Sequence, residues 1–333
     1  MESRVTATDV AKLAGVSQSS VSRVYFEGAS VSKKTREKVL AAAEQLGYRP
    51  NEFARSLITN RTKIIGLVMK GIHNPFYPQV LKQFTTTFKN LGYSILYVDT
   101  NNDEIQKEDI EMLLNYKVAG VIITDAILSL SAIEDFKENQ IPLVLFNRKI
   151  ESNEFYSVCC NNLNASKQIA QYLMDQGCLN LVYIGGNANT STSREREQGF
   201  SSILNKTNMT YSKYVSDFSY KGGYNTVKKI IAEGTIPDGF FVANDIMALG
   251  ALDALRENST EIPNHTKVIG FDNIEMSSWP NYNLTTWEQP VEEMVLKSVH
   301  YLMNEIENYT GFAQNIEING KLIVRGTTKP IDY

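Results

Sequence analysis

Residues 6–24 read TATDVAKLAGVSQSSVSRV, and this stretch decides how the chain begins to fold. Thr6 followed three residues later by Asp9 indicates a capping box, in which the hydroxyl accepts a backbone N–H and the carboxylate reaches back to the cap. Apolar residues, Leu13 among them, then repeat at helical spacing, and Gly15 ends the run where a left-handed backbone is easiest. The pattern predicts a short helix between Thr6 and Gly15.

A second short helix is expected directly after this turn, with Ser17 as its cap. Val21 and Val24 would face inward, which leaves a polar outer face made of Gln18, Ser19, Ser22 and Arg23. Two helices joined by a Gly-Val-Ser turn match helix-turn-helix geometry, in which the second helix enters the major groove. Arginine can donate twice to guanine, glutamine can pair with adenine, and serine can bond base edges or phosphates. An ordinary helical hairpin with a polar surface is the alternative.

A third helix is predicted from a cap at Ser32 to Gly47, with apolar residues that complete a small three-helix core: Val39, Leu40, Ala43 and Leu46. The charge distribution separates this head from the rest of the chain. Residues 1–63 hold 11 Lys and Arg against 6 Asp and Glu, whereas the remainder holds 22 against 31. A basic head on an acidic body is expected when only the head meets a polyanion such as DNA.

Length and composition set the outer limits. The 333 residues, 43% hydrophobic and 21% charged, have the composition of a globular protein with room for more than one domain. No apolar stretch approaches the ~18 residues of a membrane span, so we expect a soluble cytoplasmic protein without a membrane partner. Cys159, Cys160 and Cys178 show no metal-ligand spacing and the histidines are scattered, so neither a metal nor another cofactor is expected.

Several segments of the head together resemble the lactose/galactose repressor (LacI/GalR) family of transcriptional regulators: residues 5–11 (VTATDVA), 14–17 (AGVS), 21–24 (VSRV), 31–36 (VSKKTR) and 46–51 (LGYRPN). The chain departs from the family at Tyr25-Phe26, where a Leu-Asn pair is frequent, so contacts of that asparagine are not carried over. The resemblance implies a dimer that binds a pseudo-palindromic DNA operator. We expect DNA contacts in the head from Thr6, Ser17, Gln18, Ser19, Ser22 and Arg23.

Residues 51–57 (NEFARSL) resemble the hinge helix of that family, which pairs with its dimer mate and inserts a leucine into the minor groove. Leu57 occupies the position of that leucine, and Asn51, Ala54 and Arg55 would accompany it on DNA. A helix this short is marginal alone, so it would form only on DNA in a dimer, where the apolar wedge kinks the duplex. The alternative is a flexible linker with one stray leucine.

Beyond residue 63, short apolar runs alternate with helical segments, a rhythm typical of βαβ units and parallel sheets. The expected strands are Ile64–Met69, Ser94–Val98, Val118–Thr124, Leu143–Phe146, Leu181–Ile184, Phe240–Ala243 and Val268–Phe271. The body resembles periplasmic sugar-binding proteins, which implies two doubly wound parallel-sheet lobes. The predicted division is a helix-turn-helix domain (1–50), a hinge (51–62) and an effector-binding domain (63–333), with lobes of about 63–161 plus 290–319 and about 162–289 plus 320–333.

Polar residues at the ends of these strands are candidates for a ligand site, because such folds bind ligands at the carboxyl ends of strands. Acidic, amide and guanidinium groups suit vicinal hydroxyls, and an aromatic ring suits the apolar face of a sugar. By resemblance, the expected effector-binding residues are Asn74, Phe76, Asn147, Arg148, Arg196, Asn244, Asp272, Trp279 and Gln289.

Each of these residues also has a purely structural interpretation. Asn244 and Asp272 could cap turns, Arg196 could pair with a neighbouring glutamate, and Trp279 could be core. The family often has Asp-Arg where this chain has Asn147-Arg148, which makes the expected pocket more positive. A sugar phosphate or a sugar acid is therefore an alternative to a plain sugar as the effector.

Other classes of protein fit less well. No G-x-G-x-x-G follows a strand, and neither a P-loop nor a G-x-S-x-G motif occurs, so we do not expect an enzyme. An extracytoplasmic sugar-binding protein would share the body but would need an export signal and would lack the head. We expect a repressor whose operator affinity is controlled by a small sugar-like effector between the lobes.

Overall fold

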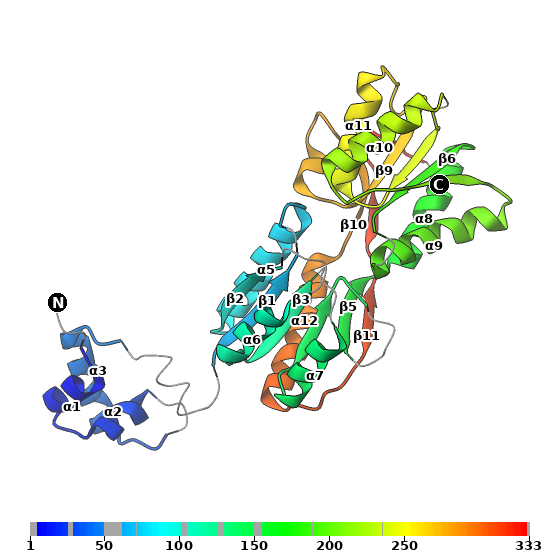
Figure 1. Ribbon diagram of the computed structural model, residues 1–333. Coiled ribbons are helices and arrows are strands. Elements are labelled where there is room, and N and C mark those ends of the chain that lie inside the picture. The colour runs from blue at the N-terminus through cyan, green and yellow to red at the C-terminus, as the bar shows by residue number, and fades with distance from the viewer. Residues whose placement is uncertain are drawn as a thin grey trace. The chain divides into compact units, whose positions relative to one another are not determined.

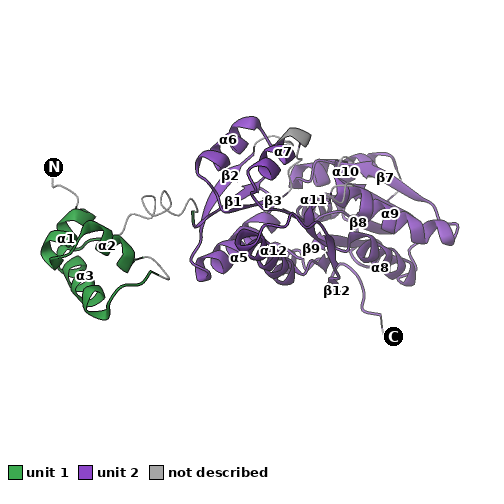
Figure 2. Ribbon diagram, turned by 90° about the horizontal axis from the view of Figure 1, so that it is seen from below, with its two compact units in different colours: residues 1–62 green, residues 63–333 purple. Residues whose placement is uncertain are grey.

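The computed structural model describes residues 5–25, 29–49, 62–70, 72–100, 105–124, 129–149, 155–187, 190–234 and 236–331. The chain divides into two compact units, Met1–Thr62 and Lys63–Tyr333, coloured separately in Figure 2. No helix among the described residues is long and apolar enough to cross a membrane.

The described residues of the first unit form three helices: α1 (Ala7–Ala14), α2 (Gln18–Val24) and α3 (Lys33–Leu46). The capping box is confirmed, because the Thr6 backbone N–H donates to Asp9 at 2.9 Å and the Asp9 N–H donates to the Thr6 hydroxyl at 3.4 Å. Ser17 and Ser32 cap the next two helices as expected. Gly15 ends α1 in the left-handed conformation at φ 66°.

The core of this unit is built from small residues and valines: Val10, Ala11, Ala14, Val21, Val24, Val39, Ala42 and Ala43. The expectation that Leu40 belongs to it was wrong, since Leu40 is 45% exposed, and Leu13, which shares the helical spacing of the apolar residues in α1, is 47% exposed. Both are apolar, but each lies about 100° around its helix from an inward alanine or valine, outside the narrow stripe that three short helices can bury.

The second unit begins with a six-stranded sheet that forms its amino-terminal lobe. Its strands, in the order in which they pair, are β11 (Asn315–Ile318), β5 (Tyr156–Cys160), β4 (Leu143–Phe146), β3 (Gly120–Thr124), β1 (Ile64–Met69) and β2 (Ser94–Asp99), all parallel. Among the described residues, four helices cover it: α5 (Phe76–Asn90) packs with α12 (Val291–Glu307), and α6 (Lys107–Asn115) packs with α7 (Leu130–Glu138), as Figure 1 shows.

A second six-stranded sheet forms the carboxyl-terminal lobe. Its order is β12 (Lys321–Ile323), β10 (Thr285–Glu288), β9 (Lys267–Asp272), β8 (Gly239–Val242), β6 (Leu181–Gly185) and β7 (Tyr211–Val215), parallel except for the β10–β12 pair. The helices pack in two pairs, α8 (Asn162–Asp175) with α9 (Ser191–Lys206) and α10 (Tyr220–Ala232) with α11 (Asp245–Glu257). A short 3-10 helix, η1, spans Glu275–Ser278.

All seven expected strands are present within a residue or two, and the fold class of two parallel-sheet lobes is confirmed. The chain passes from one sheet to the other after β5, between β10 and α12, and between β11 and β12. Five strands were not expected from the sequence: β5, β7, β10, β11 and β12. In the edge strand β7, every residue is exposed or half-buried, so no continuous apolar run marks it.

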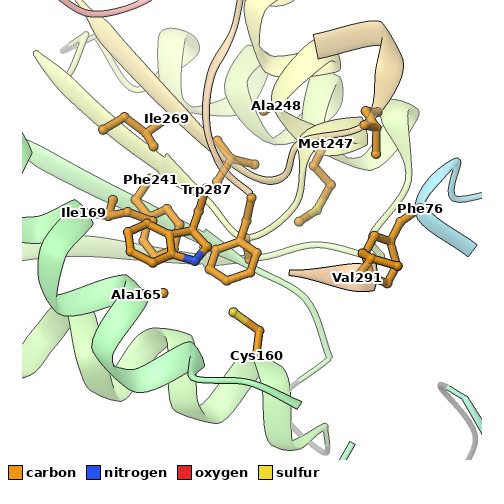
Figure 3. Close-up of a cluster of buried hydrophobic side chains, with 14 of the residues drawn as sticks. Phe76, Cys160, Ala165, Ile169, Phe241, Met247, Ala248, Ile269, Trp287 and Val291 are labelled. Atoms are coloured by element: carbon orange, nitrogen blue, oxygen red, sulfur yellow. The ribbon is translucent and has the colours of Figure 1, made fainter. Parts of the chain in front are cut away.

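The largest fully buried side chain is Trp287 of β10. Figure 3 shows its indole within the hydrophobic cluster of the second unit, among Cys160, Ala165, Ile169 and Phe241. Cys160 ends β5 and Ala165 lies on α8, so this tryptophan packs where the chain passes between the sheets. Burying an aromatic ring of this size contributes strongly to holding that junction together.

Candidate functional site

Polar side chains gather where the carboxyl ends of the two sheets meet. Asn74 follows β1 and Asn147 follows β4 in the amino-terminal lobe, whereas Asp272 ends β9 and Gln289 follows β10 in the carboxyl-terminal lobe. Arg196 reaches the same place from α9. Parallel strands bring their carboxyl ends to one edge, so residues far apart in the sequence meet there.

Asp272 is the centre of this cluster and is only 6% exposed. One carboxylate oxygen accepts a hydrogen bond from Gln289 Nε2 at 2.7 Å and lies 4.0 Å from Arg196 Nη2. The Asn74 side chain also hydrogen-bonds to it, across the two lobes. Burial raises the pKa of Asp272 to about 6, although Arg196 and the hydrogen bonds from Gln289 and Asn74 oppose the rise.

Arg196 is held on every side. Its Nε donates to Asn162 Oδ1 at 2.9 Å, its Nη1 donates to the Ala243 carbonyl, and its guanidinium lies 3.6 Å from the centre of the Phe271 ring. With 3% exposure it is a buried cation paired with Asp272 rather than with a neighbouring glutamate. These partners fix the direction in which the remaining guanidinium hydrogens point.

The amino-terminal lobe contributes Asn147, Arg148 and Tyr77. Asn147 has a left-handed backbone, φ 59°, which asparagine tolerates better than most residues. Its side chain hydrogen-bonds to the Tyr77 hydroxyl, and Arg148 Nη1 donates to Thr192 Oγ1 of the other lobe at 3.1 Å. Burial raises the pKa of Tyr77, and Arg148, Asp272 and Arg196 all act on it, which places these groups close together.

Two oxygens in this cluster have no partner among the described residues. Asn147 Oδ1 and Gln289 Oε1 are both inaccessible to solvent, and their side chains are 5% and 3% exposed. A buried acceptor without a donor costs free energy, so such groups in a native fold call for an explanation. Each of these two oxygens therefore lacks the hydrogen-bond donor that a native fold normally supplies.

Three expected residues have other surroundings. Asn244 caps α11, since its Oδ1 accepts the Met247 N–H at 3.1 Å, as in the capping alternative. Phe76 is 1% exposed within the hydrophobic cluster, edge-on to Tyr77. Trp279 is 47% exposed at the end of η1, and the contacts described for it are turn hydrogen bonds rather than contacts with the cluster.

Sequence reasoning missed Tyr77, Asn162 and Asp245. Tyr77 directly follows the expected Phe76, and its helix turns the hydroxyl toward Asn147. Asp245 is fully buried, accepts from Thr286 Oγ1 at 2.5 Å and from the Ile274 N–H at 2.9 Å, and has a pKa far above its ordinary value because of burial and the nearby Asp272. No group of three or more acidic, histidine or cysteine side chains among the described residues could hold a metal ion.

The first unit presents the predicted polar face of α2. The side chains of Gln18, Ser19, Ser22 and Arg23 are all exposed. The hydroxyls of Thr6 and Ser17 serve as caps, and Ser17 also lies 2.8 Å from the Ser19 hydroxyl, so contacts of these residues with another molecule would be made beside a cap. Asn51, Ala54, Arg55 and Leu57 lie outside the described residues.

Comparison with known proteins identifies this arrangement. Residues 6–51 match the bacterial regulatory proteins of the lacI family, and residues 65–277 match a periplasmic binding protein domain. The chain belongs to the lacI family. It is 30% identical over 326 residues to the ribose operon repressor of Halalkalibacterium halodurans, covering 97% of each chain.

Solved structures agree with this assignment of a lacI-family regulator. The crystal structure of the lac repressor dimer bound to operator and the anti-inducer ONPF superposes with a TM-score of 0.88 at 27% identity, covering 98% of this chain and 99% of that one. A periplasmic binding protein/LacI transcriptional regulator from Alkaliphilus metalliredigens, complexed with D-xylulofuranose, has a TM-score of 0.71 at 27% identity, covering 81% of this chain and 100% of that one. This lacI-family chain is therefore a DNA-binding transcriptional regulator with an effector-binding domain, not an enzyme.

Proposed function

We propose that the effector of this regulator is a small sugar of pentose or hexose size, bound among Asp272, Arg196, Asn147, Arg148 and Gln289. The observation that carries the proposal is the pair of buried amide oxygens without partners, Asn147 Oδ1 and Gln289 Oε1. They need hydrogen-bond donors, and sugar hydroxyls are donors that also accept. Arg148 and Arg196 would donate to the same hydroxyls, and Asp272 would accept from them.

A neutral sugar fits these groups better than a sugar phosphate or sugar acid. A phosphate or carboxylate group would add acceptors and negative charge but no donor for the two amide oxygens, which the sugar hydroxyls alone can satisfy. Arg196 is already paired with Asp272, and Arg148 donates to Thr192. The names of two similar proteins support the same class, since one represses a ribose operon and the other was crystallised with D-xylulofuranose. We take D-ribose as the first probe.

On the DNA side, we propose that Gln18, Ser19, Ser22 and Arg23 meet base edges, with Thr6 and Ser17 beside them at helix caps. The proposed hinge, residues 51–62, would add Asn51, Ala54, Arg55 and Leu57 in the minor groove. In this division, residues 1–50 form the DNA-binding domain and 63–333 the effector-binding domain, with lobes of about 63–161 plus 290–319 and about 162–289 plus 320–333. We also place the protein in the cytoplasm, because a regulator meets its operator DNA there.

The proposed assembly is a homodimer on a pseudo-palindromic operator. The exposed aromatic side chains around α10 and η1 suit such a contact. Tyr220 and Tyr282 both donate to Asp253, at 2.6 and 3.1 Å, and the Tyr282 N–H donates to the Trp279 carbonyl. Trp279 and Tyr220 are 47% and 38% exposed, and aromatic residues gathered on one surface are typical of protein interfaces. The second copy supplies a partner, as in the lac repressor dimer.

Calorimetry with D-ribose, D-xylulose and D-ribose 5-phosphate tests the proposal. Asp272→Ala should weaken binding of the sugar at least tenfold, because a buried guanidinium and amide lose their partner at about 1–3 kcal/mol or more. Asp175→Ala, an exposed aspartate at the end of α8, is the matched control. DNA binding should survive in both variants. Unchanged sugar affinity in Asp272→Ala would show that the effector binds elsewhere.

A further inference from the structure

Lys149 connects the two lobes on one side of the Asp272 cluster. It follows β4 in the amino-terminal lobe, and its Nζ donates to Glu195 Oε1 on α9 of the carboxyl-terminal lobe at 2.7 Å. The same Nζ also contacts Glu317 on β11, within its own lobe. The Lys149 backbone N–H donates across the lobes as well, to Ser191 Oγ at 3.1 Å. The lysine and Glu195 side chains are only 17% and 21% exposed, so solvent screens this pair incompletely.

Asn162 links Glu195 to Arg196 by hydrogen bonds to both side chains. Asn162 is 1% exposed; its Nδ2 donates to Glu195 Oε2 at 3.2 Å, and its Oδ1 accepts from Arg196 Nε at 2.9 Å. The amide therefore has one donor and one acceptor atom, each used by a different neighbour. An asparagine held at both ends cannot turn without breaking one of these hydrogen bonds.

We propose that Lys149, Glu195 and Asn162 form a positioning relay, in which the ion pair between the lobes holds the Asn162 amide and thereby sets the Arg196 guanidinium for effector binding. The inference rests on the proposed role of Arg196 at the effector, but Lys149 and Glu195 need not touch the effector themselves. The relay makes the affinity for the effector depend on whether the lobes lie close enough for Lys149 to reach Glu195.

Glu317 makes the relay reversible. If the lobes separate, Lys149 can keep its charge paired with Glu317 on its own lobe, so opening breaks one ion pair and not both. Burial alone would lower the pKa of Lys149, but its hydrogen bonds to the two glutamates raise it, so the side chain is cationic when both pairs are formed. Glu195 loses its cation on opening, and the orientation of Asn162 is then less restrained.

The helix α9 supplies a matched control two residues along. Glu197 Oε2 accepts from Lys213 Nζ at 2.7 Å, the same distance as in the Lys149–Glu195 pair, but Lys213 lies on β7 of the same lobe. Glu195→Gln and Glu197→Gln therefore remove the same charge from the same helix. Only the first removes an ion pair between lobes.

The first measurement needs no effector. Spin labels at Leu91→Cys and Leu179→Cys, exposed positions on the two lobes, report the interlobe distance, because the three native cysteines are buried. Labelled chains are diluted with unlabelled ones so that each measured distance lies within one chain. We expect Glu195→Gln and Lys149→Met to broaden or shift the distance distribution, and Lys149→Arg and Glu197→Gln to leave it as in the wild type. Identical distributions in all five proteins would overturn the relay.

The second measurement is the affinity for D-ribose. Glu195→Gln should bind it five- to tenfold more weakly, and Glu197→Gln should stay within twofold of the wild type. Asn162→Ser should lose affinity to a similar extent while its interlobe distances stay unchanged, because it breaks the relay beyond the ion pair. If the wild type fails to bind D-ribose, the proposed effector is wrong, whereas the distance measurement still decides the relay. Equal loss in Glu195→Gln and Glu197→Gln contradicts the relay alone.

Discussion

Gln289 Nε2 donates to a carboxylate oxygen of Asp272 at 2.7 Å, while Gln289 Oε1, on the same amide, has no partner among the described residues. The nitrogen of this amide therefore fixes Asp272, and its oxygen is left to accept a hydrogen bond from another molecule. Asp272 in turn hydrogen-bonds to Asn74 of the opposite lobe. A molecule that donates to Gln289 would act on a carboxylate that already joins the two lobes, which gives effector binding a direct route to lobe geometry.

The first prediction concerns stability and pH. The pKa of Asp272 is about 6 in the fold against 3.8 ordinarily, so the folded chain holds this proton more tightly than the unfolded chain. Its stabilising contribution is present below about pH 4 and is lost as pH rises to about 6, because the fold must then bury the charge. A shift of about two units corresponds to about 3 kcal/mol.

Asp272→Asn removes this titration. The free energy of unfolding of Asp272→Asn minus that of the wild type should therefore rise between about pH 4 and pH 7 and stay level above that. Urea denaturation at a series of pH values measures the difference between the two proteins, so that the titration of other groups cancels. A difference that stays constant across this range contradicts a buried, proton-retaining Asp272.

The second prediction concerns the charge preference of the site. Asn147→Asp places a carboxylate beside Arg148 and Tyr77, and the added negative charge should disfavour an anionic ligand. We expect the affinity for D-ribose 5-phosphate to fall about tenfold relative to that for D-ribose, a change of about 1.4 kcal/mol. Asn205→Asp, the same change at an exposed position of α9, should leave the ratio unaltered. Calorimetry with both ligands measures it, and an unchanged ratio in Asn147→Asp contradicts the placement.

Local signals in the sequence predicted a large part of this structure. Thr6, Ser17 and Ser32 cap helices as their side-chain chemistry requires, and Gly15 takes the left-handed turn. The continuous apolar runs became buried parallel strands. Polar residues at strand ends could also be predicted to meet, and Arg196, Asp272 and Gln289 do. Each of these correct predictions depends on residues close in sequence or on the general geometry of parallel sheets.

What the sequence did not predict depends on tertiary packing. Leu13 and Leu40 have the spacing of core residues, yet the three short helices bury only a narrower stripe. The sequence alone suggests that Trp279 is a pocket wall or part of the core, but the turn after η1 leaves its side chain exposed. Asn162 carries no motif, and its link to Arg196 appears only when α8 and α9 pack together.

The third prediction concerns the dimer. Trp279→Ser should weaken dimerisation at least tenfold if its exposed ring packs against a second copy, because aromatic anchors contribute most of the energy at interfaces. Leu179→Ser removes a more exposed apolar side chain, 79% against 47%, from the same lobe and should leave the dimer intact. Sedimentation over a range of concentrations measures the dissociation constant. Equal dimerisation in the two variants would show that the contact lies elsewhere on the chain.

The fourth prediction concerns base recognition by Arg23, whose side chain is exposed on the outer face of α2. A guanidinium in the major groove can donate twice to guanine, so Arg23→Ala should cost about 1–3 kcal/mol on the operator and relax the preference at one base position. Lys38→Ala is the control, because it also removes one positive charge from the head but lies on α3, outside the predicted face. Binding is measured on an operator selected from random DNA by the wild-type protein, on single-base variants of that operator, and on unrelated DNA. A loss confined to the operator identifies Arg23 as a base contact, whereas an equal loss on operator and unrelated DNA shows that it meets only phosphates.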